Sequence, residues 1–298
     1  MRVTTNMLSE NMLRQIQNLG SQQSKLQTQV ATGQRIFLPE DDAPAVGRVL
    51  ALETEQRALT QFQRNLDRAL ELSQASFGGL QQLKKISDRA GEIGTLGTGS
   101  LNPDANRAYA SEVNQLLEQT LQFANTRFRN DYVFAGTAID AAPFTATRDA
   151  NGVITAAAYV GNSERAAVQI SENSSITPGT PGATNAGIGD FINRLVALRD
   201  ALNANDTAAI RTAQSDLITS EDLLVSSLAE HGGVQTRIEA NRAQLLDRAQ
   251  NLEQLVSGET DADLPTTIVR LNQSQTAYQA ALQSAANIMR ISLLDYIR

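Results

Sequence analysis

Apolar side chains near the start of the chain recur in alternating steps of four and three residues. Within residues 4–32 this spacing predicts one amphipathic helix whose apolar positions form a heptad seam. A single glutamine, Gln23, interrupts the seam, and Gly33 is placed to end the helix in a left-handed conformation. The apolar seam positions are Met12, Ile16, Leu19, Leu26 and Val30.

The end of the chain repeats this pattern. The segment from Gly258 to Pro265 interrupts a helical stretch, and a last helix is predicted to follow it. Its heptad seam is again broken by one glutamine, Gln275. The other seam positions are Leu264, Ile268, Leu271, Tyr278, Leu282, Ala285 and Met289.

Helical patterns also follow the first seam. A long helix is predicted from about residue 43 to residue 96, and the acidic residues 40–42 are placed to cap its start. The glycine-rich run from Gly94 to Ser100 is expected to break this helix. Asn102 and Pro103 are then expected to begin the next helix, as its cap and first residue.

The pattern changes after residue 130, where short β-prone runs replace the helical spacing. Asn151-Gly152 lies between two such runs and predicts the turn of a β-hairpin. Residues 172–187 are rich in Ser, Thr, Pro and Gly, and are predicted to form a loop. We therefore expect a small β-rich insert at about residues 131–185.

Helices are expected to resume near Asp190, with a further cap at residues 205–207 and a soft point at Gly232-Gly233. Helices at both ends with a β-rich insert between them favour a long hairpin. The predicted fold class is mainly α, a long antiparallel helical bundle or coiled coil of the terminal regions with a small β-rich inserted domain. The expected domains are terminal coiled-coil assembly segments at 1–40 and 260–298, a helical bundle at 41–130 and 186–259, and the β-rich insert at 131–185.

The two terminal seams are narrow. Burying each Leu or Ile contributes roughly 1.5–3 kcal/mol, whereas ordering the backbone costs about 1–2 kcal/mol per residue. A lone pair of such helices is therefore marginal, and neighbouring copies can supply the missing burial. We expect both ends to be mobile in the free subunit and helical on assembly; the alternative is stable pairing within one domain. The residues expected at the assembly interface are Met12, Ile16, Leu19, Leu26, Val30, Ile268, Leu271, Tyr278, Leu282, Met289 and Leu293.

Composition narrows the classes of partner. The net charge of −7 argues against nucleic acid and against an anionic membrane surface, because both require a basic face. No run of 18 apolar residues predicts a membrane span, and the first 30 residues lack an ordinary secretory signal. The absence of cysteine excludes disulfides and thiolate metal sites.

Candidate catalytic chemistry is sparse. His231 is the only histidine, so a metal site of the His-Glu-x-x-His type is excluded, and a helix-terminal or solvated position is expected for it. The Gly94–Gly99 run lacks the lysine of a phosphate-binding loop. Adjacent acidic residues such as Asp41 and Asp42 do not face each other on a helix, so capping explains them better than catalysis. We expect no catalytic residue, cofactor or metal, and no enzyme activity.

Several segments resemble the hook–filament junction proteins of the bacterial flagellin family. The opening Met1–Met7, the segment Ala31–Ile36 followed by Pro39–Asp42, the run Tyr132–Thr137, and the ending Ser292–Arg298 are each similar to motifs of that family. The family more often has proline directly after the paired aspartates, whereas Ala43 intervenes here. The likeness is strong over about residues 1–70, 131–145 and 265–298, and weak over 146–185.

The resemblance implies a structural adaptor that joins the flagellar hook to the filament. It implies a ring of copies between hook-associated protein 1 and the first flagellin subunits. It also implies an extracellular place in the flagellum, export through the flagellar type III channel without a cleaved signal, and a cytoplasmic export chaperone that binds the C-terminal helix.

Two other functions remain open from the sequence. A flagellin filament subunit would share the architecture, and would dominate sheared filaments instead of forming a trace band. A cytoplasmic coiled-coil scaffold would be recovered only from the soluble cell fraction.

Overall fold

The computed structural model describes the backbone of residues 5–100 and 102–296, and the side chains of residues 10–100 and 102–287. Contacts divide the chain into two units. The terminal unit comprises the residues up to Ala58 and those from Arg248 onward, and the central unit comprises Leu59–Asp247. Over the described residues, no helix has the length and apolar character that a membrane span requires. The helices are α1 (Thr5–Thr32), α2 (Ala43–Gly99), α3 (Pro103–Ala124), α4 (Gly182–Asn203), α5 (Thr207–Thr260) and α6 (Leu264–Tyr296).

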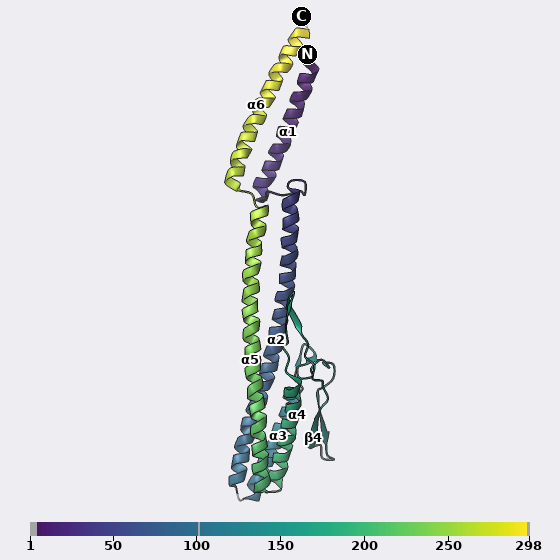
Figure 1. Cartoon of the computed structure of the whole chain (residues 1–298), viewed down its shortest axis with the longest axis vertical. Coiled ribbons are helices and arrows are strands. Elements are labelled where there is room, and N and C mark those ends of the chain that lie inside the picture. The colour runs from purple at the N-terminus through teal and green to yellow at the C-terminus, as the bar shows by residue number, and fades with distance from the viewer. Residues whose placement is uncertain (1–4, 101, 297–298) are drawn as a thin grey trace. The chain divides into compact units, whose positions relative to one another are not determined.

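In the terminal unit, α1 and α6 lie side by side (Figure 1). The end predicted for α1 is confirmed, since Gly33 has a φ of 73° and its N–H donates to the carbonyl of Gln29 at 2.9 Å. A left-handed residue at this position is the usual way to stop a helix. The predicted interruption near the end of the chain is also confirmed, because α5 ends at Thr260 and α6 begins at Leu264.

The core of the central unit is built from α2, α3, α4 and α5. Aliphatic side chains spaced by three or four residues point inward from these helices, as the helical period requires. Few aromatic residues take part, in keeping with the aliphatic composition of the chain. Fully buried side chains include Leu80, Leu83 and Ile93 of α2, Val113 and Leu117 of α3, and Ile188, Phe191 and Leu195 of α4.

Local capping signals in the sequence predict the starts of α3 and α5 correctly, whereas α4 begins at Gly182 and not near Asp190 as expected. The Asn102 side chain accepts a hydrogen bond from the N–H of Asp104 at 2.9 Å, and Pro103 opens α3. At α5, the carboxylate of Asp206 accepts hydrogen bonds from the N–H groups of Ala208 and Ala209. Both contacts satisfy N–H groups that lack a partner in the first turn.

The predicted break at Gly94–Ser100 is wrong, because α2 continues to Gly99. The reason is tertiary. A Cβ atom at Gly97 would lie 2.5 Å from Leu202 Cδ2, so a side chain there would collide with α4. These glycines therefore permit close packing of helices instead of ending one.

The strands form three separate antiparallel pairs. The predicted hairpin at Asn151-Gly152 is confirmed, since it joins β3 to β4 and Gly152 has a φ of 82°. The predicted loop at 172–187 is wrong, because this range contains β6 and the start of α4. Its small polar side chains form hydrogen bonds with distant parts of the chain, which the sequence pattern does not reveal. For example, the hydroxyl groups of Thr184 and Ser227 are 2.9 Å apart. The pairs are β1 (Arg127–Phe128) with β2 (Asp131–Tyr132), β3 (Phe144–Arg148) with β4 (Ile154–Tyr159), and β5 (Val168–Ser171) with β6 (Ser174–Ile176).

The expectation that His231 is solvated or helix-terminal is wrong. The α5 helix passes through Gly232-Gly233 without a break, and the His231 side chain is only 2% exposed. Its Nδ1 atom lies 3.2 Å from Ser73 Oγ of α2. Burial lowers the pKa of this imidazole, so the neutral form is favoured. The histidine therefore packs between two helices as an uncharged core residue.

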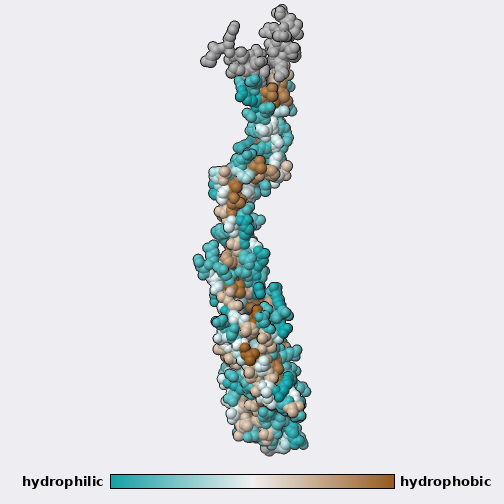
Figure 2. All heavy atoms as spheres, turned by 90° about the vertical axis from the view of Figure 1, so that its right-hand side faces the viewer, coloured by the Kyte–Doolittle hydropathy of each residue, from teal (hydrophilic) through white to brown (hydrophobic). Residues whose placement is uncertain are grey.

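Large apolar side chains remain at the surface in both units. Figure 2 shows hydrophobic patches separated by hydrophilic areas. Single exposed side chains of this kind are ordinary in proteins. They matter more where the buried core beside them is thin, which is the case for the pair of α1 and α6. The most exposed include Phe37 at 61%, Ile218 at 56%, Val160 at 55% and Val269 at 55%.

Candidate assembly surface

The two segments that connect the terminal helices to α2 and α5 pair with each other. Gln34 and Asp261 form an antiparallel β-bridge. The N–H of Arg35 donates to the carbonyl of Thr260 at 2.6 Å, and the N–H of Ala262 donates to the carbonyl of Gly33 at 2.8 Å. Since these residues are far apart in the sequence, the bridge joins the N-terminal and C-terminal parts of the chain at one point. We call residues 33–42 and 261–263 the paired connectors.

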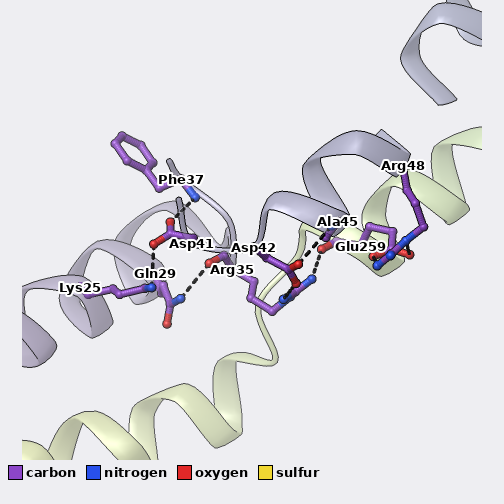
Figure 3. A network of polar contacts seen from close by, with 9 residues as sticks. All are labelled: Lys25, Gln29, Arg35, Phe37, Asp41, Asp42, Ala45, Arg48 and Glu259. Atoms are coloured by element: carbon purple, nitrogen blue, oxygen red, sulfur yellow. Dashed lines mark hydrogen bonds and ion pairs between the residues drawn. The ribbon is translucent and has the colours of Figure 1, made fainter. Parts of the chain in front are cut away.

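Arg35 is the centre of a polar network around the paired connectors (Figure 3). Its guanidinium donates to the carboxylate of Asp42 at 2.9 Å and to the carbonyl of Glu259 at 2.7 Å. Its own carbonyl accepts from the side chain of Gln29 at 2.8 Å. The planar guanidinium is suited to such a role because it offers several donors in a fixed geometry. The Arg35 side chain thus contacts both the start of α2 and the end of α5.

A second arginine, Arg48, also links the start of α2 to the end of α5. Arg48 of α2 binds the carboxylate of Glu259 through two hydrogen bonds, of 2.9 and 2.8 Å. Hydrogen bonding from Arg48 lowers the pKa of Glu259, and hydrogen bonding from Arg35 and from the N–H of Ala45 lowers the pKa of Asp42. Both carboxylates are therefore ionised at neutral pH. The contact from Asp42 to Ala45, at 3.1 Å, also confirms the predicted cap of α2.

Asp41 does not cap α2, although the sequence predicted that the acidic residues 40–42 would do so. Instead of capping a helix, its carboxylate accepts the N–H groups of Phe37 at 3.0 Å and Leu38 at 2.9 Å, and binds Lys25 at 2.6 Å. Hydrogen bonding from Leu38, then Lys25, then Phe37 holds the pKa of Asp41 well below its usual range. These contacts fold residues 37–41 into a fixed turn beside α1.

The apolar seam predicted on α1 lies on one side of the helix in the structure. Leu26 is 8% exposed, and Met12, Ile16, Leu19 and Val30 are half-buried. Among the described side chains of α1, these positions are thus brought together along one face.

The seam on α6 is only partly buried. Leu271 and Tyr278 are half-buried, whereas Ile268 and Leu282 are each 44% exposed. The positions buried instead are Thr267 and Ser274, at 8% and 6% exposure. The Tyr278 ring of α6 lies against α1 at a glycine, since a Cβ atom at Gly20 would lie 3.6 Å from Tyr278 Cε2. The side chains of Met289 and Leu293 lie outside those that the structure describes.

The run Tyr132–Thr137 lies in the central unit and links the strands to the helices. Phe134 is fully buried against α2, where a Cβ atom at Gly79 would lie 2.8 Å from its ring. Gly136 has a φ of 70°, and a Cβ atom there would collide with Asn162. Both the left-handed backbone and the close approach require glycine at this position. The family-like motif is therefore a packing element of the fold.

Sequence reasoning missed the network of Arg35, Arg48 and Glu259. Periodicity cannot find these residues, since an ion pair between positions 48 and 259 leaves no regular spacing in the sequence. The sequence assigns Asp41 and Asp42 to helix capping and to a family-like motif, and neither assignment points to Arg48 or Glu259.

Comparison with known proteins finds similarity to flagellar proteins. The model of the bacterial flagellin N-terminal helical region matches residues 3–138. Two proteins named flagellar hook-associated protein 3 align over nearly all of the chain. That of Escherichia coli is 26% identical and covers 99% of each chain; that of Salmonella typhimurium is 25% identical and covers 100% of each.

A solved structure supports the same fold. The crystal structure of FlgL from Bacillus cereus superimposes with a TM-score of 0.60 at 18% identity, and covers 70% of this chain and 99% of that one. The long helices with a small set of antiparallel strands are thus a fold already known among flagellar proteins, and the predicted fold class is confirmed. The resemblance to hook–filament junction proteins of the flagellin family is therefore confirmed, since this chain is similar over nearly all of its residues to proteins named flagellar hook-associated protein 3.

Proposed function

We propose that this chain is a structural adaptor that joins the hook of the bacterial flagellum to its filament. The observation that carries this proposal is the alignment of the whole chain, end to end, with two flagellar hook-associated proteins 3. The paired connectors support it, because they join the N-terminal and C-terminal parts of the chain at one point, as an adaptor with a terminal assembly domain requires.

The proposed partners are hook-associated protein 1 on one side, flagellin on the other, and copies of the chain itself in a ring. The assembly contacts are assigned to residues 1–40 and 260–298, outside the helical bundle and the β-rich insert. Within them, Ile268 and Leu282 are each 44% exposed, although apolar side chains gain free energy by burial. A neighbouring subunit that covers them would supply that burial.

The route to this place is part of the same proposal. The chain leaves the cell through the flagellar type III channel without a cleaved signal, and an export chaperone binds α6 in the cytoplasm beforehand. A chaperone of this kind would cover the exposed apolar positions of α6 before assembly. No catalytic step is assigned to the chain.

The ends of the free subunit are proposed to be mobile and to become ordered on assembly. The thin burial of the helix pair supports this. Hydrogen exchange on the dilute monomer is the measurement, with rapid exchange expected over residues 5–30. Full protection of these amides would favour the alternative, in which the two ends pair stably within one subunit.

Deletion of the gene tests the adaptor role directly. Electron microscopy is expected to show hooks that carry no filament, with flagellin released to the medium. Cells complemented with the intact gene serve as the control. Normal filaments on the deletion strain would overturn the proposal.

A flagellin subunit is the second candidate, because the matching family model is named for the flagellin N-terminal helical region. Abundance separates the two candidates. In sheared filaments a flagellin is the main band, whereas a junction adaptor is a trace band.

A further inference from the structure

The middle of α5 holds the one histidine of the chain inside the core of the central unit. His231 is 2% exposed, and its side chain has one hydrogen-bond contact, at 3.2 Å from Nδ1 to Ser73 Oγ of α2. The other ring nitrogen, Nε2, is buried and has no partner among the residues that the structure describes. A protonated imidazole carries a hydrogen on both nitrogens, so the cation would bury a donor without an acceptor. The neutral ring therefore fits this position and the charged ring does not.

Two glycines follow this histidine directly in the interior of α5. Nothing lies within 4 Å of a Cβ atom built at Gly232 or at Gly233, so packing does not require glycine at either position. At Gly79 and Gly97, by contrast, a Cβ atom would collide with a side chain of another segment. In a helix interior, alanine is favoured over glycine by a factor of about five. The backbone of α5 is therefore locally weak next to its buried histidine.

The charged groups around the imidazole do not offset a positive charge on it. Glu230 of α5 favours the cation and Arg165, between β4 and β5, disfavours it, and these two residues pair with each other at 3.1 Å. On α2, the ionisable residue closest in sequence to Ser73 is Glu71, which pairs with Arg129 at 2.6 Å. One turn earlier on α5, the contact with α4 joins two uncharged hydroxyl groups, 2.9 Å apart. Burial is thus the largest influence on the ring, and it lowers the pKa of the histidine.

We propose that His231, Gly232 and Gly233 form an acid-sensitive opening point in α5. At neutral pH the ring is uncharged, and α5 packs against α2 without interruption. On protonation the ring leaves the core and the helix opens at the two glycines, while the packing of α3 against α4 stays closed. This device lies in the central unit and is independent of the proposed adaptor role.

The direction of the pH effect follows from the burial of the neutral ring. Such a histidine stabilises the closed state fully above its ordinary pKa of about 6.5, and this contribution is lost as the pH falls. The equilibrium constant for opening should rise by up to about tenfold for each pH unit below that value. Ordinary carboxyl groups titrate mainly below about pH 5. The range from about pH 6.5 to about pH 5 therefore reports on His231.

NMR of the full chain tests the opening directly, because a single histidine gives unambiguous imidazole C–H resonances. During acid titration these resonances should move together with the amide resonances of residues 227–238 in α5. The amide resonances of Val113 and Leu117, which are fully buried in α3, should stay in place over the same range. A ring that titrates without movement of the α5 amides would overturn the opening. Movement of the α3 amides at the same pH would also overturn it, since the whole unit would then be unfolding.

Alanine substitution tests the part played by the glycines. Gly232→Ala and Gly233→Ala should each lower the opening constant about fivefold, and so move the midpoint of the His231 titration down by about half a pH unit. Gly258→Ala is the matched control, since Gly258 lies in the same helix, has nothing within 4 Å of a Cβ atom, and belongs to the terminal unit. It should leave the midpoint unchanged. The same shift in all three variants, or no shift in any, would show that α5 does not open at the glycine pair.

His231→Gln removes the titrating group and keeps a side chain that can form a hydrogen bond with Ser73. In urea denaturation, the unfolding constant of the parent chain should rise by up to about tenfold between about pH 6.5 and about pH 5.5, and that of the variant should change much less. An equal rise in both chains would overturn the role of the histidine. If the variant does not fold, the titration of the ring in the parent chain decides by itself. None of these results bears on the adaptor role, which the deletion strain tests separately.

Discussion

The two units of the chain differ in how much of their stability they can supply themselves. In the central unit, four helices enclose fully buried Leu, Ile and Phe side chains. In the terminal unit, the buried apolar side chains among those described are Leu26, Ala45 and Leu252, and α6 buries Thr267 and Ser274 instead of its larger residues. A core of this kind offsets chain entropy only weakly. The difference teaches that the central unit encloses a core of its own, whereas the terminal unit leaves most of its apolar seam partly exposed.

The largest effect is expected from a cavity in the central unit. Phe191 is fully buried, so Phe191→Ala should lower the free energy of unfolding by about 3–5 kcal/mol. Urea denaturation followed by circular dichroism measures it. Leu282→Ala in the terminal unit is the control, and its effect should stay within about 0.5 kcal/mol. Equal losses from the two variants would break the comparison.

Overpacking should give the next largest effect. A Cβ atom at Gly79 would lie 2.8 Å from the ring of Phe134, so Gly79→Ala should destabilise the central unit by about 1–3 kcal/mol. Gly78→Ala is a matched control, since nothing lies within 4 Å of a Cβ atom there. Alanine has a higher helix propensity than glycine, so Gly78→Ala should be neutral or slightly stabilising. A loss equal to that of Gly79→Ala would show that contact with Phe134 is not the cause.

Acid should loosen the terminal unit through its connectors. The folded pKa values of Asp42 and Glu259 are lowered, so their ion pairs contribute fully above the ordinary carboxyl range and are lost as the pH falls through about 4 and below. The amide resonances of Arg35 and Ala262, followed by NMR during acid titration, should move towards unfolded positions.

Glu259→Gln is the control for this titration. It removes the charge that pairs with Arg48, so the connectors should already be loosened at neutral pH and change less on acidification. A variant that titrates like the parent chain would show that the ion pair does not hold the connectors.

The smallest effect is expected on the buried face of α6. The hydroxyl of Ser274 is buried without a hydrogen-bond partner in the described part of the chain. Since an unpaired buried hydroxyl costs free energy, Ser274→Ala should be neutral or stabilise the terminal unit by up to about 1 kcal/mol. Thermal unfolding measures this, and a loss of stability would mean that the hydroxyl has a partner.

The sequence predicts those parts of the fold that depend on residues close together in the chain. The caps at Asn102 and Asp206, the stop at Gly33 and the hairpin at Asn151-Gly152 are all local, and all are confirmed. Each depends on the conformational preference or hydrogen bonding of one or two side chains.

The features that depend on distant residues could not be predicted. The sequence predicts a helix break at Gly97, because the close approach of Leu202 from another helix is not visible in it. It likewise predicts a solvated His231, because the contact with Ser73 is made only in the folded chain. Heptad spacing on α6 predicts its amphipathic character, but the helix buries Thr267 and Ser274 more deeply than its apolar seam. Of the candidate site, the assembly role of the seam residues stays a prediction, and the ionic network of the connectors was not predicted.

The paired connectors also have a mechanical consequence. The chain passes twice between the terminal helices and the helices α2 and α5, and the bridge from Arg35 to Thr260 and from Ala262 to Gly33 ties the two passages together. Tension or torque on either α1 or α6 is therefore shared by two covalent paths, and Arg48 with Glu259 clamps the helices that receive the load. Two connectors tied together by hydrogen bonds resist twisting more than a single strand would.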